Sequence, residues 1–202
     1  SWAVVDDREL YKTLKYMYIA PINIPIYLLG RGGARFIVGS IAVLITILTG
    51  VFFLNVDINL AEVNWGLFFV SLTLGIIMLA LIGLMLAGWT LITARHEGFI
   101  GEAVAAALYI FSGAVFPLDV LPEWLRPVGY FMPTTYWLEL LRRSLVGDVA
   151  QAFPTLSQFN NLEILGVMIG LSILFGLVSV WIFKVCDNIA RENGMIDRTT
   201  NY

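Results

Sequence analysis

Long uncharged apolar runs alternate with short polar segments along this chain of 202 residues. A membrane-spanning helix needs about 20 mostly apolar residues, and four runs reach that length. Residues 36–54 and 65–93 carry no charge, 98–118 contains one acid, Glu102, and 164–183 is again uncharged. The pattern predicts an all-α integral membrane protein with four transmembrane helices in a single domain.

A different pattern precedes the first span. In residues 7–20, apolar side chains recur every three or four positions while basic ones fall largely on the other side, which is typical of an amphipathic helix. Pro21 and Pro25 are expected to end this helix. Such a helix either lies on the membrane surface or docks onto a cytoplasmic partner.

The connection before the last span is broken by four prolines. They are Pro117, Pro122, Pro127 and Pro133. Each removes a backbone donor and restricts the preceding residue, so residues 119–147 cannot form one continuous span. Irregular backbone within the membrane is stable only where protein or water forms hydrogen bonds with its N–H and C=O groups. We therefore expect either a re-entrant helical pair at an outer gate or a helical hairpin resting on the outer surface.

Two short helices are predicted within this connection. The first covers residues 122–128, is opened by proline, and places Trp124 as an interfacial anchor. The second starts near residue 134, with Thr134 or Thr135 as its N-cap. Its Glu139 is expected to pair with the arginines three and four positions later, Arg142 and Arg143.

The distribution of basic residues predicts the orientation of the chain. Positively charged loops stay preferentially in the cytoplasm. Nine of the twelve basic residues lie before the first span, between the second and third, or after the fourth: Arg8, Lys12, Lys15, Arg31, Arg35, Arg95, Lys184, Arg191 and Arg198. Both termini are therefore expected on the cytoplasmic side.

Composition excludes several classes of function. The chain is 59% hydrophobic and 13% charged, with a mean hydropathy of +0.83, which lies outside the range of soluble proteins. Its net charge of −3 gives no reason to expect nucleic acid as a partner. One cysteine, Cys186, and one histidine, His96, do not make a usual metal site. No GxxxxGK[ST] loop is present, so the chain cannot hydrolyse ATP by itself in the P-loop manner. No catalytic, cofactor-binding or metal site is expected.

Two further features each allow two interpretations. Glu102 is either a functional intramembrane acid or an interfacial residue that reaches water or Arg95. Gly166 and Gly170 give the last span a GxxxG spacing, which suits close packing within the subunit or at a subunit interface.

The run SGAVFPLDVLPEWLRPVGYFMPTTYWLELLR, residues 112–142, resembles the C-terminal signature of type-2 ATP-binding-cassette exporter permeases. In that family the corresponding segments are paired re-entrant helices near the outer mouth of the translocation path. The resemblance implies an outer gate made of Phe116, Pro117, Pro122, Trp124, Pro133, Tyr136 and Arg142.

The start of the chain is similar to the family's coupling helix, which sits in a groove of the ATPase. The family shows an acid, then Gly-Thr-Leu-Glu and Ser-Pro. The corresponding residues here are Glu9, Lys12, Thr13, Leu14, Lys15, Ala20 and Pro21. A lysine therefore replaces the glycine, another lysine replaces the acid, and alanine replaces the serine.

The resemblance also implies partners. A separate P-loop ATPase would bind ATP and Mg²⁺, and a second permease copy or homologue would complete a dimer in the plasma or inner membrane. The four spans would correspond to the last four of six, with two more upstream or on another polypeptide. The apolar spans suit a hydrophobic or amphipathic cargo such as a lipid, a drug or a lipid-linked glycan. The alternatives are a membrane scaffold or assembly subunit and an ion-coupled secondary transporter, which the scarcity of intramembrane acids disfavours.

Overall fold

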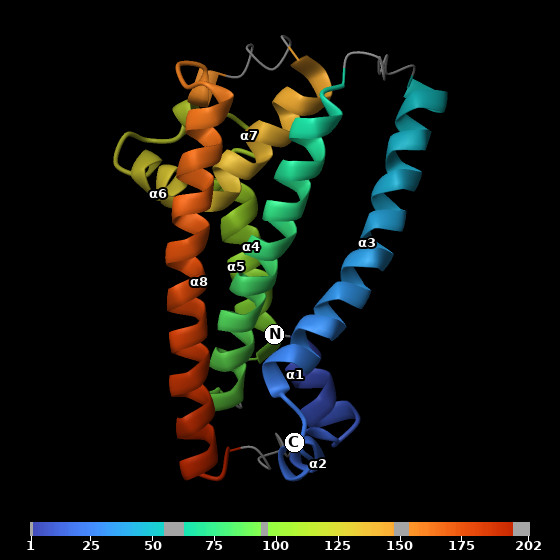
Figure 1. The fold of residues 1–202 in the computed structure, drawn as a ribbon, viewed down its shortest axis with the longest axis vertical. Coiled ribbons are helices and arrows are strands. Elements are labelled where there is room, and N and C mark those ends of the chain that lie inside the picture. The colour runs from blue at the N-terminus through green and yellow to red at the C-terminus, as the bar shows by residue number, and fades with distance from the viewer. Residues whose placement is uncertain (1, 55–62, 94–96, 148–153, 196–202) are drawn as a thin grey trace. The chain divides into compact units, whose positions relative to one another are not determined.

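The computed structural model describes residues 2–54, 63–93, 97–147 and 154–195, and every regular element in these ranges is a helix (Figure 1). The all-α prediction is thus confirmed for the described residues. The elements in chain order are α1 (Trp2–Val5), the π-helix η1 (Asp6–Leu10), α2 (Leu14–Ile19), α3 (Ile24–Leu54), α4 (Trp65–Ile92), α5 (Glu97–Phe111), the 3₁₀ helix η2 (Leu118–Val120), α6 (Arg126–Phe131), α7 (Pro133–Val146), the 3₁₀ helix η4 (Pro154–Leu156) and α8 (Asn161–Glu192).

Three of the described helices are long and apolar enough to cross a membrane: Ile24–Phe53, Trp65–Ile92 and Asn161–Glu192. The fourth expected span, 98–118, is not one continuous helix. Its helix, α5, has 15 residues and is about 22 Å long, whereas the hydrocarbon layer is about 30 Å thick. The backbone leaves the helix after Phe111 and turns at Gly113, whose φ of 75° is favourable only for glycine.

The first long helix begins well before the apolar run that predicts it. The Asn23 side chain accepts a hydrogen bond from the Ile26 backbone N–H at 3.4 Å, as an N-cap residue does. Pro25 lies in the first turn of α3, where a backbone N–H would have no intrahelical partner, so proline is tolerated. Pro25 therefore starts α3 and does not end the preceding amphipathic segment. The apolar residues 36–53 of α3 are largely exposed within this chain.

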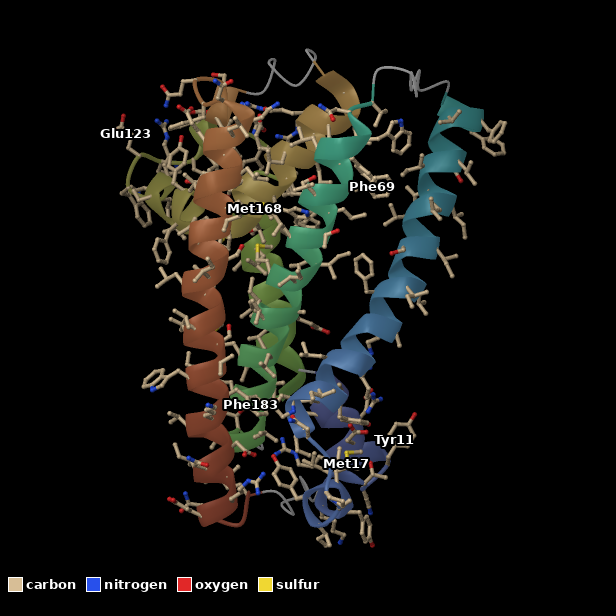
Figure 2. All side chains as sticks on the ribbon, in the orientation of Figure 1. Tyr11, Met17, Phe69, Glu123, Met168 and Phe183 are labelled. Carbon is tan, nitrogen blue, oxygen red and sulfur yellow. The ribbon has the colours of Figure 1, made fainter. Side chains whose placement is uncertain are left out.

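The chain divides into two compact units, which are described separately. The first contains residues 1–57, 80–102 and 177–202. Its core combines side chains from α1, α2, the start of α3, the end of α4 and the end of α8. They are Val4, Leu14, Ile24, Leu28, Leu84, Ala87, Leu91, Phe183 and Ala190. Figure 2 labels Met17 and Phe183, and Met17 packs against this cluster.

The second unit contains residues 58–79 and 103–176. Its core is formed by Leu140 of α7, Leu156 of η4, and Ile164 and Met168 of α8; Met168 is labelled in Figure 2. Trp137 of α7 packs against this cluster from the side of α4. The core therefore fixes α7 against the first half of α8.

Close helix contacts in both units depend on glycines other than the GxxxG pair. A Cβ at Gly75 would stand 2.0 Å from Trp137 Nε1, and one at Gly88 would stand 2.9 Å from Phe183 Cα. Around Gly166 and Gly170, in contrast, no described atom lies within 4 Å of such a Cβ. The interpretation of the GxxxG spacing as packing within the subunit is therefore wrong for the described residues.

Candidate functional site

The segment that resembles a coupling helix is not one helix. The expected helix over 7–20 is divided into η1 and α2, and Lys12 between them has a φ of 52°. The Tyr11 backbone N–H donates to Asp6 O at 2.9 Å, and the Thr13 N–H donates to Asp7 O at 2.8 Å. These bonds close a tight turn, so α2 leaves in a new direction. Amphipathic spacing alone did not predict this break, because contacts with other helices hold the preceding acids.

Those acids form an ion network with α3. Asp7 is 2% exposed; it pairs with Arg31 and accepts a hydrogen bond from the Tyr27 hydroxyl at 3.0 Å. Asp6 pairs with Arg31 at 3.5 Å and with Arg35 at 2.6 Å. The network joins η1 to one face of α3, since Arg31 and Arg35 are four residues apart on that helix. The sequence pattern did not predict that these two arginines pair with Asp6 and Asp7.

Arg8 connects the same segment to α4. Its guanidinium is buried, with the residue 3% exposed, and donates to the backbone carbonyls of Thr90 at 2.8 Å and Leu91 at 3.3 Å. The last carbonyls of a helix lack intrahelical partners and carry partial negative charge. Arg8 therefore acts as a tertiary cap on the C-terminal end of α4.

Tyr18, near the end of α2, contacts α8. Its hydroxyl donates to Asp187 Oδ1 at 2.6 Å, and Arg191 Nε donates to Asp187 Oδ2 at 3.0 Å. The Arg191 guanidinium also lies over the Tyr18 ring, 4.6 Å from its centroid. Burial raises the pKa of Tyr18, and the hydrogen bond to Asp187 and the charge of that carboxylate add to the effect, while Arg191 opposes it.

The predicted coupling residues have different environments. Leu14 is 2% exposed in the core of the first unit, and Thr13 stands at the N-cap of α2 without a side-chain cap bond. Lys12 and Pro21 are exposed, and Glu9 lies in η1. Four large side chains of this segment that the family motif does not include are also exposed: Tyr11, Tyr16, Ile19 and Ile22. Figure 2 shows the Tyr11 ring projecting from this segment.

The proline-rich connection in the second unit begins with a buried anchor. Leu118 is fully buried, and its N–H donates to Thr155 Oγ1 at 3.0 Å. Arg126 then folds back, donating to the carbonyls of Leu121 at 3.0 Å and Asp119 at 2.8 Å. These bonds hold residues 122–125 in a turn. The first short helix is therefore α6, starting at Arg126, and the prediction of a helix over 122–128 is wrong in its bounds.

The second short helix begins at proline. Pro133 is the first residue of α7 and Met132 occupies the N-cap, so the prediction that Thr134 or Thr135 caps this helix is wrong. Thr135 instead donates from Oγ1 to the carbonyl of Gly129 at 2.6 Å, which ties α7 to α6. The Tyr136 hydroxyl adds a bond to the carbonyl of Tyr130 at 2.8 Å.

Glu139 is the centre of a buried ion cluster, and its predicted pairing is confirmed. Its carboxylate, 3% exposed, accepts hydrogen bonds from Arg142 at 2.8 Å and Arg143 at 2.9 Å. Arg142 also donates to the carbonyl of Gly113 at 3.2 Å, and Arg143 to that of Leu156 at 2.7 Å. The cluster therefore joins α7 to the turn after α5 and to η4.

The space beside Glu139 is too small for a cargo. Its cavity, lined in part by Ser112, Thr135, Arg142 and Thr155, has a volume of about 10 Å³, comparable to a single water molecule. The cluster therefore has a structural role in holding the connection together.

The residues expected at an outer gate do not converge on one site. Pro133 is buried, Tyr136 packs against the core of the second unit, and Arg142 belongs to the ion cluster. Pro122 is exposed, and Trp124 is 76% exposed. Phe116 and Pro117 are half-buried. The set thus divides into a packed part on α7 and an exposed part before α6.

Glu102, the expected intramembrane acid, lies on α5 with an exposed side chain. Its suggested partner, Arg95, lies outside the described residues.

These features define a polytopic α-helical membrane protein with a packed, charge-anchored segment before its first long helix and a proline-rich connection before its last. The model of the ABC-2 type transporter family matches residues 9–146, a range that includes both regions. The chain belongs to the ABC-2 type transporter family. Neither the curated proteins nor the solved structures include a match to it.

Proposed function

We propose that this chain is the permease subunit of an ATP-driven exporter. Separate P-loop ATPase subunits bind ATP and Mg²⁺, and a second permease copy or homologue completes the transport unit. The cargo is a hydrophobic or amphipathic molecule, such as a lipid, a drug or a lipid-linked glycan. Membership of the ABC-2 type transporter family is the observation that carries this proposal.

The ATPase docks on the exposed side of α2. Tyr16 is 63% exposed and Ile19 is 81% exposed; apolar side chains gathered on a short polar-flanked segment are typical of protein contact surfaces. Lys12 is exposed in the turn before this helix. Because it stands where the family has glycine, the groove that receives α2 in this system is expected to offer an acidic group.

Movement of α2 passes to the membrane helices through the contacts already described. Leu14 is seated in the core of the first unit, and Tyr18 bonds to Asp187 of α8. The turn before α2 is tied to α3 by the Asp7–Arg31 pair. A push on α2 therefore acts on α3 and α8 through hydrogen-bonded, buried or half-buried groups, which supports its role in coupling.

In this proposal both termini lie on the cytoplasmic side of the plasma or inner membrane, because nine of the twelve basic residues lie before the first span, between the second and third, or after the last. The fourth crossing that this orientation requires is made by α5 together with the residues 112–118 that follow it. The connection 119–147 then faces outward and covers the exit of the path as a re-entrant pair. The lengths of α6 and α7, 6 and 14 residues, support this role, since neither can cross a layer of about 30 Å.

The experiment compares two charge insertions in the complex purified in mild detergent. Ile19→Asp places a carboxylate on α2, and Val120→Asp, at a position 71% exposed, places one on the outward connection. We expect a P-loop ATPase to copurify with the wild type and with Val120→Asp, and its ATP hydrolysis to fall at least 5-fold with Ile19→Asp. Absence of any nucleotide-dependent partner from the wild type would contradict the proposal.

A further inference from the structure

A pocket in the first unit has a chemistry that transport does not account for. It has a volume of about 360 Å³ and lies between residues 22–25 and the last turns of α8, where Phe183, Lys184, Asp187, Asn188 and Arg191 line it. Every residue of its lining belongs to the same unit. Two of the pocket residues, Asp187 and Arg191, also contact the Tyr18 side chain of α2.

The lining suits a singly charged anion attached to an apolar body. The lining contains two cations, Lys184 and Arg191, and one carboxylate, Asp187, so it carries one excess positive charge. Arg191 uses Nε for Asp187, and a guanidinium has four further N–H donors. Asn23 and Asn188 add amide donors, while Ile24, Pro25 and Phe183 supply apolar wall.

The position of the pocket along α8 matches the headgroup layer of a bilayer. Lys184 is the first charged residue after the uncharged run 164–183, so it marks the edge of the hydrocarbon. Arg191 lies about 10 Å further along the helix axis, and a headgroup layer is about 5–8 Å thick. The two cations therefore bracket the depth at which phospholipid phosphates lie.

We propose that this pocket binds the phosphate of an anionic phospholipid headgroup. Lys184 and the terminal nitrogens of Arg191 hold the phosphodiester, whose single negative charge matches the excess charge of the lining. The asparagine amides bond to its oxygens or to headgroup hydroxyls, and the apolar wall contacts the glycerol backbone. Basic pockets between membrane helices recognise headgroups by this chemistry. A soluble phosphate shares the anion but lacks the apolar body.

The test is lipid retention by the protein purified in neutral detergent, measured by native mass spectrometry. Phosphatidylglycerol, phosphatidylcholine and inorganic phosphate are added in separate arms. We expect retention of phosphatidylglycerol to exceed that of the other two at least 5-fold and to fall as salt rises. Equal retention of phosphatidylcholine would overturn the charge-based recognition, and equal retention of inorganic phosphate would overturn the assignment to a lipid.

Variants locate the site. Lys184→Gln, at an exposed position, is expected to reduce phosphatidylglycerol retention at least 3-fold, and Lys184→Arg to restore it. Arg191→Gln reduces it further but also removes the bond to Asp187, so the lysine variants decide the outcome. Arg35→Gln, at a cation of α3 whose side chain is 55% exposed and lies outside the pocket, serves as the control and retains wild-type binding of phosphatidylglycerol. Unchanged retention in Lys184→Gln would overturn the proposal, whether or not the chain is a transporter.

Discussion

The Tyr18 hydroxyl donates a 2.6 Å hydrogen bond to Asp187, a residue 169 positions away in the chain. This bond connects the short helix α2 directly to the C-terminal part of α8. Asp187 also accepts a hydrogen bond from Arg191, whose guanidinium lies over the Tyr18 ring. The contact between α2 and α8 is therefore made by three side chains that contact one another. A movement of α2 therefore cannot leave α8 unaffected without breaking a charge-assisted bond.

Tyr18→Phe removes this bond and keeps the ring. We expect a loss of about 1–2 kcal/mol in the free energy of unfolding, because the lost hydroxyl donates to a charged acceptor, the Asp187 carboxylate. We also expect a smaller response of ATP hydrolysis to cargo in the complex. Thermal unfolding in detergent and hydrolysis assays measure the two effects. Tyr109→Phe is the matched control, since that tyrosine of α5 is 63% exposed and lies outside the proposed docking surface. Equal effects of both substitutions would contradict a specific role for Tyr18.

Stability at alkaline pH should depend on the same tyrosine. The pKa of Tyr18 is raised by burial and by Asp187 above its ordinary value of 10.0, so the folded state holds its proton more tightly than the unfolded state. The stabilisation is complete below about pH 10 and decreases as pH rises beyond it. The difference in unfolding free energy between wild type and Tyr18→Phe is therefore expected to shrink above about pH 10. A difference that stays constant or grows there would contradict the assigned environment.

Glu139→Gln tests the buried ion cluster of α7. The substitution leaves Arg142 and Arg143, whose side chains are 23% and 16% exposed, without their anion. We expect a loss of about 3 kcal/mol, the low end for a broken buried pair because both guanidinium groups retain some solvent contact. Thermal unfolding measures it.

The control for Glu139→Gln is a more exposed ion pair. Arg35 pairs with Asp6 and its side chain is 55% exposed, so Arg35→Gln should cost about 0–1 kcal/mol. Comparable losses in the two variants would show that burial does not set the strength of the cluster.

Gly75→Ala tests the contact between α4 and α7. The new Cβ would stand 2.0 Å from Trp137 Nε1, so the indole has to move, and overpacking of this kind costs about 1–3 kcal/mol. Gly83→Ala on the same helix meets no described atom within 4 Å and should not lower the thermal midpoint. A neutral Gly75→Ala would mean that Trp137 does not lie against α4.

Helix content and the Glu139 cluster could be predicted from the sequence because both depend on local spacing. Uncharged runs predict long helices, and an acid with arginines at i+3 and i+4 predicts a pair on one helix face. The bounds of α5 could not be predicted in this way, since the turn at Gly113 interrupts an apolar run without a change in hydropathy.

The contacts of the candidate coupling segment could not be predicted either. The division between η1 and α2 follows from Asp7 and Arg8, which bind α3 and the end of α4, and no local pattern contains those distant partners. The same holds for Tyr18 and Asp187. Conversely, Gly166 and Gly170 have the spacing of a helix-packing motif, but no described atom lies within 4 Å of a Cβ at either position. The spacing shows that one face of α8 carries small residues, and it does not show which helix packs on that face.

Photo-crosslinking in intact membranes tests the central claim, that α2 is where an ATPase engages this permease, most directly. A photo-crosslinking amino acid is placed at position 16, on the exposed side of α2, and separately at position 120, in the proline-rich connection, and adducts are identified by mass spectrometry. The account predicts a P-loop ATPase attached at position 16 and none at position 120. An ATPase adduct at position 120, or none at position 16 in membranes that contain the ATPase, would contradict it.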